Sequence, residues 1–293
     1  MAYDYEAFKK DVYKLTNINL DLYKERQMKR RIEALITRHK FSGFEPFFQA
    51  MTKDEELLDI FVNYLTINVS EFYRNPSQWE MFEKDVLPFL MKKYGKKLTI
   101  WSAACSTGDE PYTIAMIMAK YMPLENIKIY ATDIDDAVLR KAQLGIYADK
   151  SVAGLPKAFL EKHFTKTKDG KHYQISDDIK KCVDFRKHNL LEDKYFSDIH
   201  MVVCRNVVIY FTDEAKDMVY AGFHKSLCNE GILFIGSTEQ IMNAKDLGFT
   251  TYKAFFYQKA GAPLGAGTTT QRKITTSPVE RKPLTRPIPP KKC

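Results

Sequence analysis

The chain has 293 residues, of which 45% are hydrophobic and 28% are charged, so it is long enough to bury a large core. No segment approaches the roughly 20 apolar residues of a membrane span, and the N-terminus lacks the pattern of a signal peptide. The five cysteines form no CxxC pair, which argues against a zinc site and a disulfide framework. We expect a cytoplasmic protein with reduced thiols, no metal and no membrane insertion.

The net charge of +8 is concentrated at the C-terminal end. Residues 260–293 contain seven basic residues and one glutamate, which leaves a net charge of about +2 on the rest of the chain. This segment is rich in proline and threonine and offers little to bury, so we expect a disordered tail. The nearly neutral body gives no argument for nucleic acid as a partner.

Residues 1–75 have the apolar spacing of α-helices. Met28, Ile32 and Leu35, for example, fall on one face of the second predicted helix. This pattern predicts an N-terminal helical domain. A further helix is expected over residues 76–95, as a linker to the C-terminal part of the chain.

The second predicted helix has a basic surface. Its basic residues include Lys24, Arg26, Lys29, Arg30 and Arg31. Two interpretations of this pattern stay open: the helix has a solvated basic face, or it forms a docking surface for an acidic protein or nucleic acid.

A polar segment, LTINVSEFYRNPSQW, lies between two predicted helices at residues 65–79. It brings Asn68, Ser70 and Arg74 close together in sequence, and loops often carry function on a rigid scaffold. The alternative is a helix N-cap followed by an exposed arginine.

From residue 96 to residue 259 strands and helices alternate, which predicts an α/β fold with a parallel sheet and right-handed crossovers. The expected strands lie at 98–103, 127–133, 183–189, 199–211 and 231–237. Two further segments differ in pattern. Residues 163–188 alternate like short antiparallel strands and contain an Asp169-Gly170 turn, which predicts a small β-subdomain inserted in the sheet domain. Residues 249–259 alternate Phe and Tyr, as an edge or antiparallel strand does.

Ligands of open α/β sheets bind beyond the carboxyl ends of the strands. The small residues of Ser102–Gly108 follow the first strand and allow close approach to a ligand. This turn is not GxGxxG and lacks a P-loop lysine, which disfavours dinucleotides and ATP. Asp133 ends the second strand, where a carboxylate can accept hydrogen bonds from both ribose hydroxyls, although a helix N-cap is the common alternative. Together these features favour S-adenosylmethionine.

Six motifs occur in an order and at a spacing that resemble the CheR-type chemotaxis receptor methyltransferases over about residues 5–259. They are TINVSEFYRN, WSAACSTGDEPY, ATDID, HNLL, CRNVVIYF and GSTEQ. The resemblance implies a helical N-terminal domain and a Rossmann-like methyltransferase domain with a small antiparallel β-subdomain. It also implies methyl transfer from S-adenosylmethionine to glutamate side chains of chemoreceptors, which yields methyl esters and S-adenosylhomocysteine.

The resemblance implies a cofactor site as well. Its residues would be Asn68, Ser70, Arg74, Glu110, Asp133, Asn189, Leu190, Arg205 and Asn206. Asp133 would hold the ribose, and Asn189 with Leu190 would flank the adenine. Ser70 and Asp109 stand where the family often has Thr and Glu, and both keep the chemical group.

The reaction itself needs little chemical assistance. A glutamate with a reference pKa of about 4.3 is already ionised at neutral pH and can attack a sulfonium methyl without a general base. Positioning must then supply most of the rate. We expect Arg74 to steer the incoming carboxylate and Tyr210 to orient it or to line the transfer channel.

The implied partner is the acidic cytoplasmic helical bundle of chemoreceptors, docked by the basic second helix. Some family members also bind a receptor pentapeptide through a glycine-rich loop of the β-subdomain. Here TKTKDGKHYQ has one glycine and is shorter, so we expect direct docking by a monomer instead.

Two other function classes stay open from the residues. A base methyltransferase would have an Asn/Asp-Pro-Pro-aromatic motif where this chain has Cys204-Arg205-Asn206-Val207. A scaffold that binds without turnover would not need Arg74, Asp133 and Tyr210 together.

Overall fold

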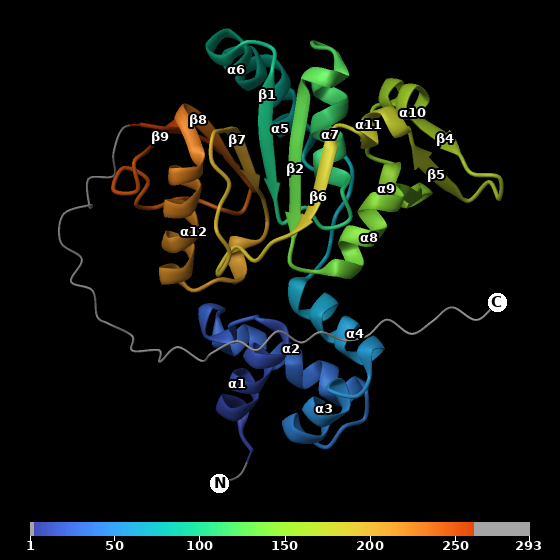
Figure 1. The fold of residues 1–293 in the computed structure, drawn as a ribbon, viewed down its shortest axis with the longest axis vertical. Helices are drawn as coiled ribbons and strands as arrows, with labels where there is room; N and C mark the ends of the chain where they lie inside the picture. Colours follow the sequence, from blue (N-terminus) through green and yellow to red (C-terminus); the bar gives the residue numbers. More distant parts are fainter. Residues whose placement is uncertain (1–2, 261–293) are drawn as a thin grey trace, which may run out of the picture.

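The computed structural model describes residues 3–260, and the tail predicted at 260–293 lies outside the described residues from position 261 on. Two bodies stack along the long axis of the molecule, with a helical domain below a sheet domain (Figure 1). The arrowheads of β1 and β2 point toward the helical domain. In residues 3–260 no helix is long and apolar enough to cross a membrane.

The N-terminal domain is built of short helices around its own aromatic core. Its elements are α1 (Tyr5–Thr16), η1 (Leu20–Leu22), α2 (Glu25–Arg38), α3 (Phe44–Met51) and α4 (Glu55–Thr66). The ring of Phe61 meets those of Phe8 and Phe47 at centroid distances of 6.0 and 5.9 Å, both edge-on. This interlocked packing gives the domain a hydrophobic cluster separate from those of the sheet.

Residues 76–94 form one continuous helical stretch. It consists of α5 (Pro76–Met81), the π-helical turn η2 (Phe82–Val86) and α6 (Leu87–Tyr94). Pro76 begins α5, where its missing N–H is not needed. Trp79, Phe82 and Leu90 are fully buried in the cluster that contains one face of the sheet. The expected linker helix therefore also covers that face.

The sheet of the described residues has seven strands in the order β6-β2-β1-β7-β8-β10-β9. They are β1 (Leu98–Ala103), β2 (Ile127–Asp133), β6 (Val183–Lys187), β7 (Ile199–Cys204), β8 (Leu227–Ile235), β9 (Phe249–Lys253) and β10 (Phe256–Lys259). The first five in the spatial order are parallel, and β10 runs antiparallel to β8 and β9. Residues 249–259 thus form a hairpin, with Phe255 in the left-handed region at φ 68°.

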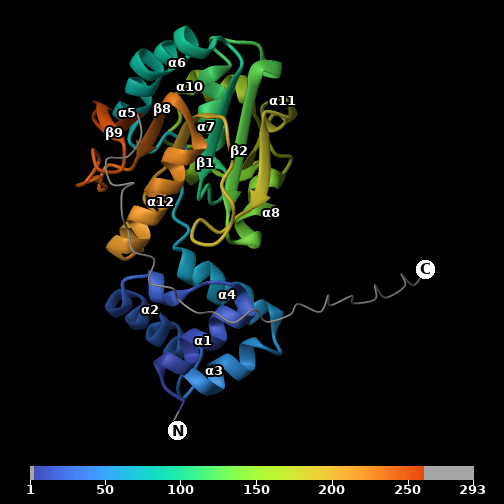
Figure 2. The same ribbon diagram turned by 60° about the vertical axis from the view of Figure 1, so that its left-hand side comes forward.

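Helices cover both faces of the sheet, so its inner strands read as nearly continuous apolar runs. The helices are α7 (Asp109–Met118), α8 (Asp136–Leu144) and α12 (Asp213–Ser226), with the short η3 (Leu124–Asn126) before β2. Ile100 of β1 belongs to the cluster shared with α7, whereas its neighbour Trp101 packs edge-on against Phe223 of α12. Figure 2 shows α12 running along its face of the sheet.

A second, three-stranded antiparallel sheet has the order β3-β5-β4. Its elements are β3 (Ile146–Ala148), α9 (Asp149–Val152), α10 (Lys157–His163), β4 (Phe164–Lys166), β5 (His172–Ile175) and α11 (Asp177–Lys180). The sheet begins before the predicted span of 163–188, because β3 is too short to show an alternating pattern and follows α8 directly. Gly170 has φ 69° in the β4–β5 turn, as a tight hairpin requires.

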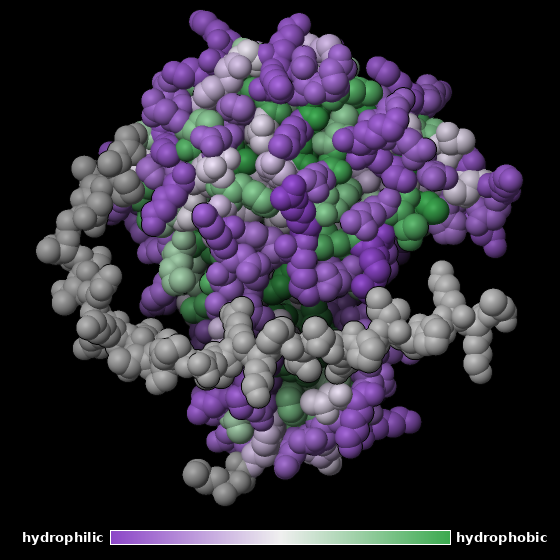
Figure 3. All heavy atoms as spheres, in the orientation of Figure 1, coloured by the Kyte–Doolittle hydropathy of each residue, from purple (hydrophilic) through white to green (hydrophobic). Residues whose placement is uncertain are grey.

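The winding of the main sheet reverses at β1, which pairs with β2 on one side and with β7 on the other. Such a switch point leaves a crevice beyond the carboxyl ends of the two strands. Those ends face the helical domain (Figure 1). Hydrophilic side chains cover most of the outer surface of both bodies on the face in Figure 3.

Candidate functional site

A cavity of about 400 Å³ lies at this switch point. It is lined by the loops that follow β1, β2, β6 and β7 and by the segment between α4 and α5. All the residues that the sequence resemblance placed at the cofactor or the acceptor line this cavity: Asn68, Ser70, Arg74, Glu110, Asp133, Asn189, Leu190, Arg205, Asn206 and Tyr210. One cavity therefore collects residues that are up to about 140 positions apart in the chain.

The turn after β1 has an unusual backbone. Ala104 and Ser106 have φ of 64° and 48°, and Gly108 has φ 88°. A Cβ at Gly108 would lie 2.9 Å from the Cβ of Ala142, so glycine is required there by both conformation and space. The turn exposes the Ser106 N–H to Asp133, whose Oδ2 accepts it at 2.8 Å.

Asp133 is a buried carboxylate at the end of β2. Burial raises its pKa to about 6, and backbone N–H donors, that of Ser106 among them, oppose the rise. Its Oδ1 accepts the Asp135 N–H at 3.1 Å. The alternative role of helix N-cap falls to Asp135, whose carboxylate accepts the Ala137 N–H and begins α8.

Glu110 and Arg205 form an ion pair at the cavity wall, with 3.3 Å between Oε2 and Nη1. Burial raises the pKa of Glu110, while Arg205 and the Ser102 hydroxyl at 2.8 Å favour its ionised form. The Arg205 guanidinium lies over the rings of Trp79 and Phe234, 5.1 and 4.9 Å from their centroids. Its Nη2 donates to Arg74 O, Asn75 Oδ1 and Gln78 Oε1 at 3.1, 3.1 and 2.7 Å.

Arg74 is held through its backbone rather than its side chain. Its carbonyl accepts hydrogen bonds from Trp79 Nε1 at 2.9 Å and from Arg205. Its half-buried guanidinium donates to Val69 O at a long 3.3 Å, and among the described residues it forms no salt bridge. Arg74 thus offers the cavity a cation outside any salt bridge of the described residues, and its charge favours the ionised form of Glu110.

Asn189 and Leu190 follow β6 and are buried. The Asn189 side chain donates to Asn17 O of the helical domain at 2.9 Å and accepts the Leu191 N–H at 3.0 Å. These bonds use one of the two amide N–H groups and one lone pair of the oxygen to hold the loop, and both Asn189 and Leu190 line the cavity.

Comparison with known families gives two adjoining matches. Residues 3–66 match the all-alpha domain of the CheR methyltransferases, and residues 68–255 match their SAM-binding domain. The chain belongs to the CheR methyltransferase family. It is therefore an S-adenosylmethionine-dependent methyltransferase, and the fold expected from the sequence motifs is confirmed.

Curated relatives cover nearly the same span as these CheR domains. A chemotaxis protein methyltransferase of Listeria monocytogenes is 43% identical over 256 residues, 87% of this chain and 97% of the relative. Chemotaxis protein methyltransferase 2 of Vibrio cholerae is 34% identical over 81% of this chain and 85% of its own length. The Borreliella burgdorferi chemotaxis protein methyltransferase is 33% identical, over 83% and 91%.

The helical domain of this CheR protein closes one side of the cavity. Tyr23 pairs with Phe211 in an antiparallel bridge, and their rings meet at 5.1 Å. The Lys24 N–H donates to Tyr210 O at 2.9 Å. Burial raises the pKa of Tyr23, which lines the cavity as a neutral phenol. Sequence reasoning missed Tyr23, because no local pattern links it to the sheet domain.

Glu239 is a second residue that the sequence left without a role, although it lies in the quoted GSTEQ motif. It is buried and accepts the backbone N–H groups of Asn206, Val207 and Gly236 at 3.0, 3.1 and 2.6 Å. Burial raises its pKa, and these donors oppose the rise. Glu239 fixes the loop after β7, in which Asn206 has φ 62°.

Proposed function

We propose that this CheR methyltransferase esterifies glutamate side chains of chemoreceptors. The observation that carries the proposal is the Arg74 cation, which forms no salt bridge within residues 3–260, at a cavity of the S-adenosylmethionine-binding family. A cation there suits an anionic acceptor, and a carboxylate needs no general base at neutral pH. The names of the curated relatives support the link to chemotaxis.

The cavity suits a nucleoside without phosphates. Ser106 lines it, and the buried Oγ of this residue has no hydrogen-bond partner within residues 3–260. Asp133 supplies a carboxylate for the ribose, and Asn189 with Leu190 borders the adenine in our proposal. We assign the remaining contacts to Asn68, Ser70, Glu110, Arg205 and Asn206, all of which line the cavity.

The bound cofactor supplies an electrophilic methyl group on a sulfonium. We propose that Arg74 guides the acceptor carboxylate toward it and that Tyr210 orients that carboxylate. A tight Arg74–carboxylate pair would stabilise the ground state and slow the reaction, so guidance is more useful than clamping. The weak hold on the guanidinium, one bond of 3.3 Å, is consistent with that role.

A labelling experiment tests this proposal. The purified chain is incubated with methyl-labelled S-adenosylmethionine and either a chemoreceptor cytoplasmic fragment or duplex DNA. We expect label on the receptor fragment that mild base releases as methanol, because methyl esters are base-labile. A fragment with its acceptor glutamates changed to glutamine serves as the control. Base-stable label, or label on the DNA, would contradict the proposal.

The pH dependence of cofactor binding follows from Asp133. Below its pKa of about 6 the carboxyl carries a proton and loses acceptor capacity for the ribose hydroxyls. The Kd for S-adenosylhomocysteine should therefore be flat above about pH 7 and rise about tenfold by about pH 5, measured by calorimetry. Asp133→Asn should abolish the slope. A slope that survives in this variant would assign it to another carboxyl, such as Glu110 or Glu239.

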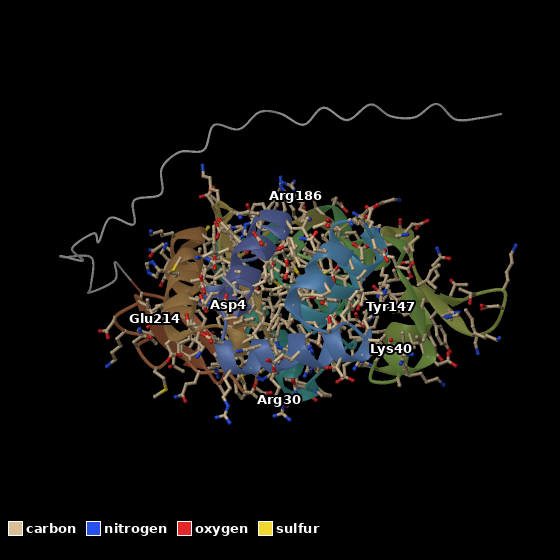
Figure 4. All side chains as sticks on the ribbon, turned by 90° about the horizontal axis from the view of Figure 1, so that it is seen from below. Asp4, Arg30, Lys40, Tyr147, Arg186 and Glu214 are labelled. Atoms are coloured by element: carbon tan, nitrogen blue, oxygen red, sulfur yellow. The ribbon has the colours of Figure 1, made fainter. Side chains whose placement is uncertain are left out.

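We propose that α2 docks the receptor, but not through all the basic residues named from the sequence. Lys24 Nζ donates to Ile209 O at 2.8 Å, and Lys29 lies over the Tyr5 ring. Arg31 donates to the backbone oxygen of Tyr64 at 2.6 Å, and its guanidinium lies over the Tyr64 ring, so Arg31 is part of the domain's own structure. Arg26 and Arg30 are exposed, and Figure 4 shows Arg30 pointing away from the body. We propose direct docking at this surface, with no role for the short β4–β5 turn.

Charge reversal of Arg26 and Arg30 to glutamate should raise the KM for a receptor fragment about tenfold at low salt, because like charges then face an acidic bundle. Calorimetry should find the affinity for S-adenosylhomocysteine unchanged. The matched control reverses Lys96 and Lys97, which are exposed before β1 at the opposite end of the strands. If reversal of Lys96 and Lys97 raised the KM as much as reversal of Arg26 and Arg30, the α2 surface would be a solvated face without a docking role.

A further inference from the structure

Asp135 connects three parts of the molecule, although it is not among the residues proposed to hold the cofactor. Its side chain is buried, with a relative exposure of 2%. Oδ1 caps α8 by accepting the Ala137 N–H at 2.8 Å, and the backbone N–H of Asp135 donates to Asp133. Oδ2 accepts hydrogen bonds from Asn63 Nδ2 and Asn68 Nδ2 at 3.1 and 2.9 Å. It also lies 3.4 Å from Thr66 Oγ1, whose single proton has a closer acceptor in Val62 O at 3.0 Å.

One of these donors, Asn68, directly follows a strained residue. Ile67, at the end of α4, has φ 50° and ψ 58°, the left-handed conformation, which costs a β-branched residue about 1–2 kcal/mol. Such a conformation persists only where its surroundings impose it. Asn68, directly after Ile67, donates to the same Asp135 oxygen as Asn63 of α4, so the carboxylate joins the two sides of the turn. The buried carboxylate of Asp135, in the sheet domain, thereby holds the strained turn at Ile67 between α4 and α5.

Contacts connect this turn to Arg74. Val69 follows the turn directly, its N–H donates to Ile67 O at 2.8 Å, and its carbonyl accepts the Arg74 guanidinium. We propose that Asp135 is a positioning residue for methyl transfer: it fixes the turn at Ile67 and so places the Arg74 guanidinium over the cavity. The inference rests on the proposed function, which assigns Arg74 to the acceptor.

Asp135→Ser separates this role from helix capping. Serine caps a helix about as well as aspartate, but its single short hydroxyl cannot serve both α8 and the two amide donors across the interface. Asp54→Ser is the matched control, since Asp54 caps α4 by accepting the Leu57 N–H at 3.1 Å. A general loss of stability from either change is measured by thermal unfolding of both variants.

The first measurement is amide hydrogen exchange of the full chain over residues 66–75. Asp135→Ser should speed exchange there about tenfold, because local opening no longer breaks the bonds to Asp135. Asp54→Ser should leave it unchanged. Equal exchange in wild type and Asp135→Ser would overturn the inference, whatever the enzyme's substrate is.

The second measurement is turnover with the receptor fragment at saturating S-adenosylmethionine. Asp135→Ser should lower kcat about tenfold or more, since misplacement of a guiding group affects mainly the transfer step. An unchanged kcat, or an equal loss in Asp54→Ser, would overturn the positioning role. A wild-type chain that fails to esterify the receptor would instead refute the proposed function.

Discussion

Asp133→Ala is expected to raise the Kd for S-adenosylhomocysteine on the order of a hundredfold, because two charge-assisted hydrogen bonds to the ribose are lost, at about 1.5 kcal/mol or more each. The carboxylate is already oriented by the N–H groups of Ser106 and Asp135, so the free protein presents it in a fixed position. Calorimetry on the purified variant gives the value directly.

Asp133→Asn is the control for this substitution. It keeps the volume and one acceptor oxygen, so its Kd should fall between those of wild type and alanine. Thermal unfolding identifies any variant in which the turn at Ser106 has collapsed. A folded Asp133→Ala protein with wild-type affinity would remove the ribose assignment.

Arg74→Ala is expected to lower the rate of methyl transfer about a hundredfold, with cofactor bound nearly as before, because it removes the cation that guides the acceptor. The change is confined to the side chain. The Arg74 carbonyl keeps its bonds to Trp79 and Arg205, so the linker path and the Glu110–Arg205 pair stay in place. Single-turnover transfer to a receptor fragment, next to calorimetry with S-adenosylhomocysteine, measures the two quantities separately.

Arg74→Lys tests which property of the side chain matters. Lysine keeps the charge but not the planar fork, so partial activity would indicate attraction at a distance, and activity as low as in alanine would indicate directed hydrogen bonds. Turnover of Arg74→Ala close to that of wild type would show that the guanidinium has no part in the reaction.

The sequence predicted the cavity better than it predicted the chain path around it. Strand alternation located β1, β2 and the start of β7, and parallel strands bring their carboxyl ends to one edge. The expected extent of β7 to residue 211 was wrong, because the strand ends at Cys204 and the short helix η4 (Val208–Tyr210) follows. For this reason Asp133 and Arg205, far apart in sequence, line one cavity with the turn after β1. The residues of the turn after β1 also predicted the kind of ligand, because the sequence alone shows that the turn lacks a P-loop lysine.

Other features had no local signal. The hairpin of β9 and β10 turns at Ala254-Phe255, without the glycine or asparagine that marks a tight turn, and Phe255 adopts a positive φ only in its packed surroundings. Tyr23 and Asp135 act through partners in the other domain, at distances in sequence that no pattern of neighbouring residues encodes.

The wall that Tyr23 contributes to the cavity makes the helical domain more than a detachable receptor-binding module. Tyr23 lines the cavity, and the Asn17–Asn189 bond joins the helical domain to the cavity loop after β6, so we expect ligand binding and domain docking to strengthen each other by thermodynamic linkage. We then expect a substitution in the helical core to weaken cofactor affinity, and a bound ligand to protect the helical domain against unfolding.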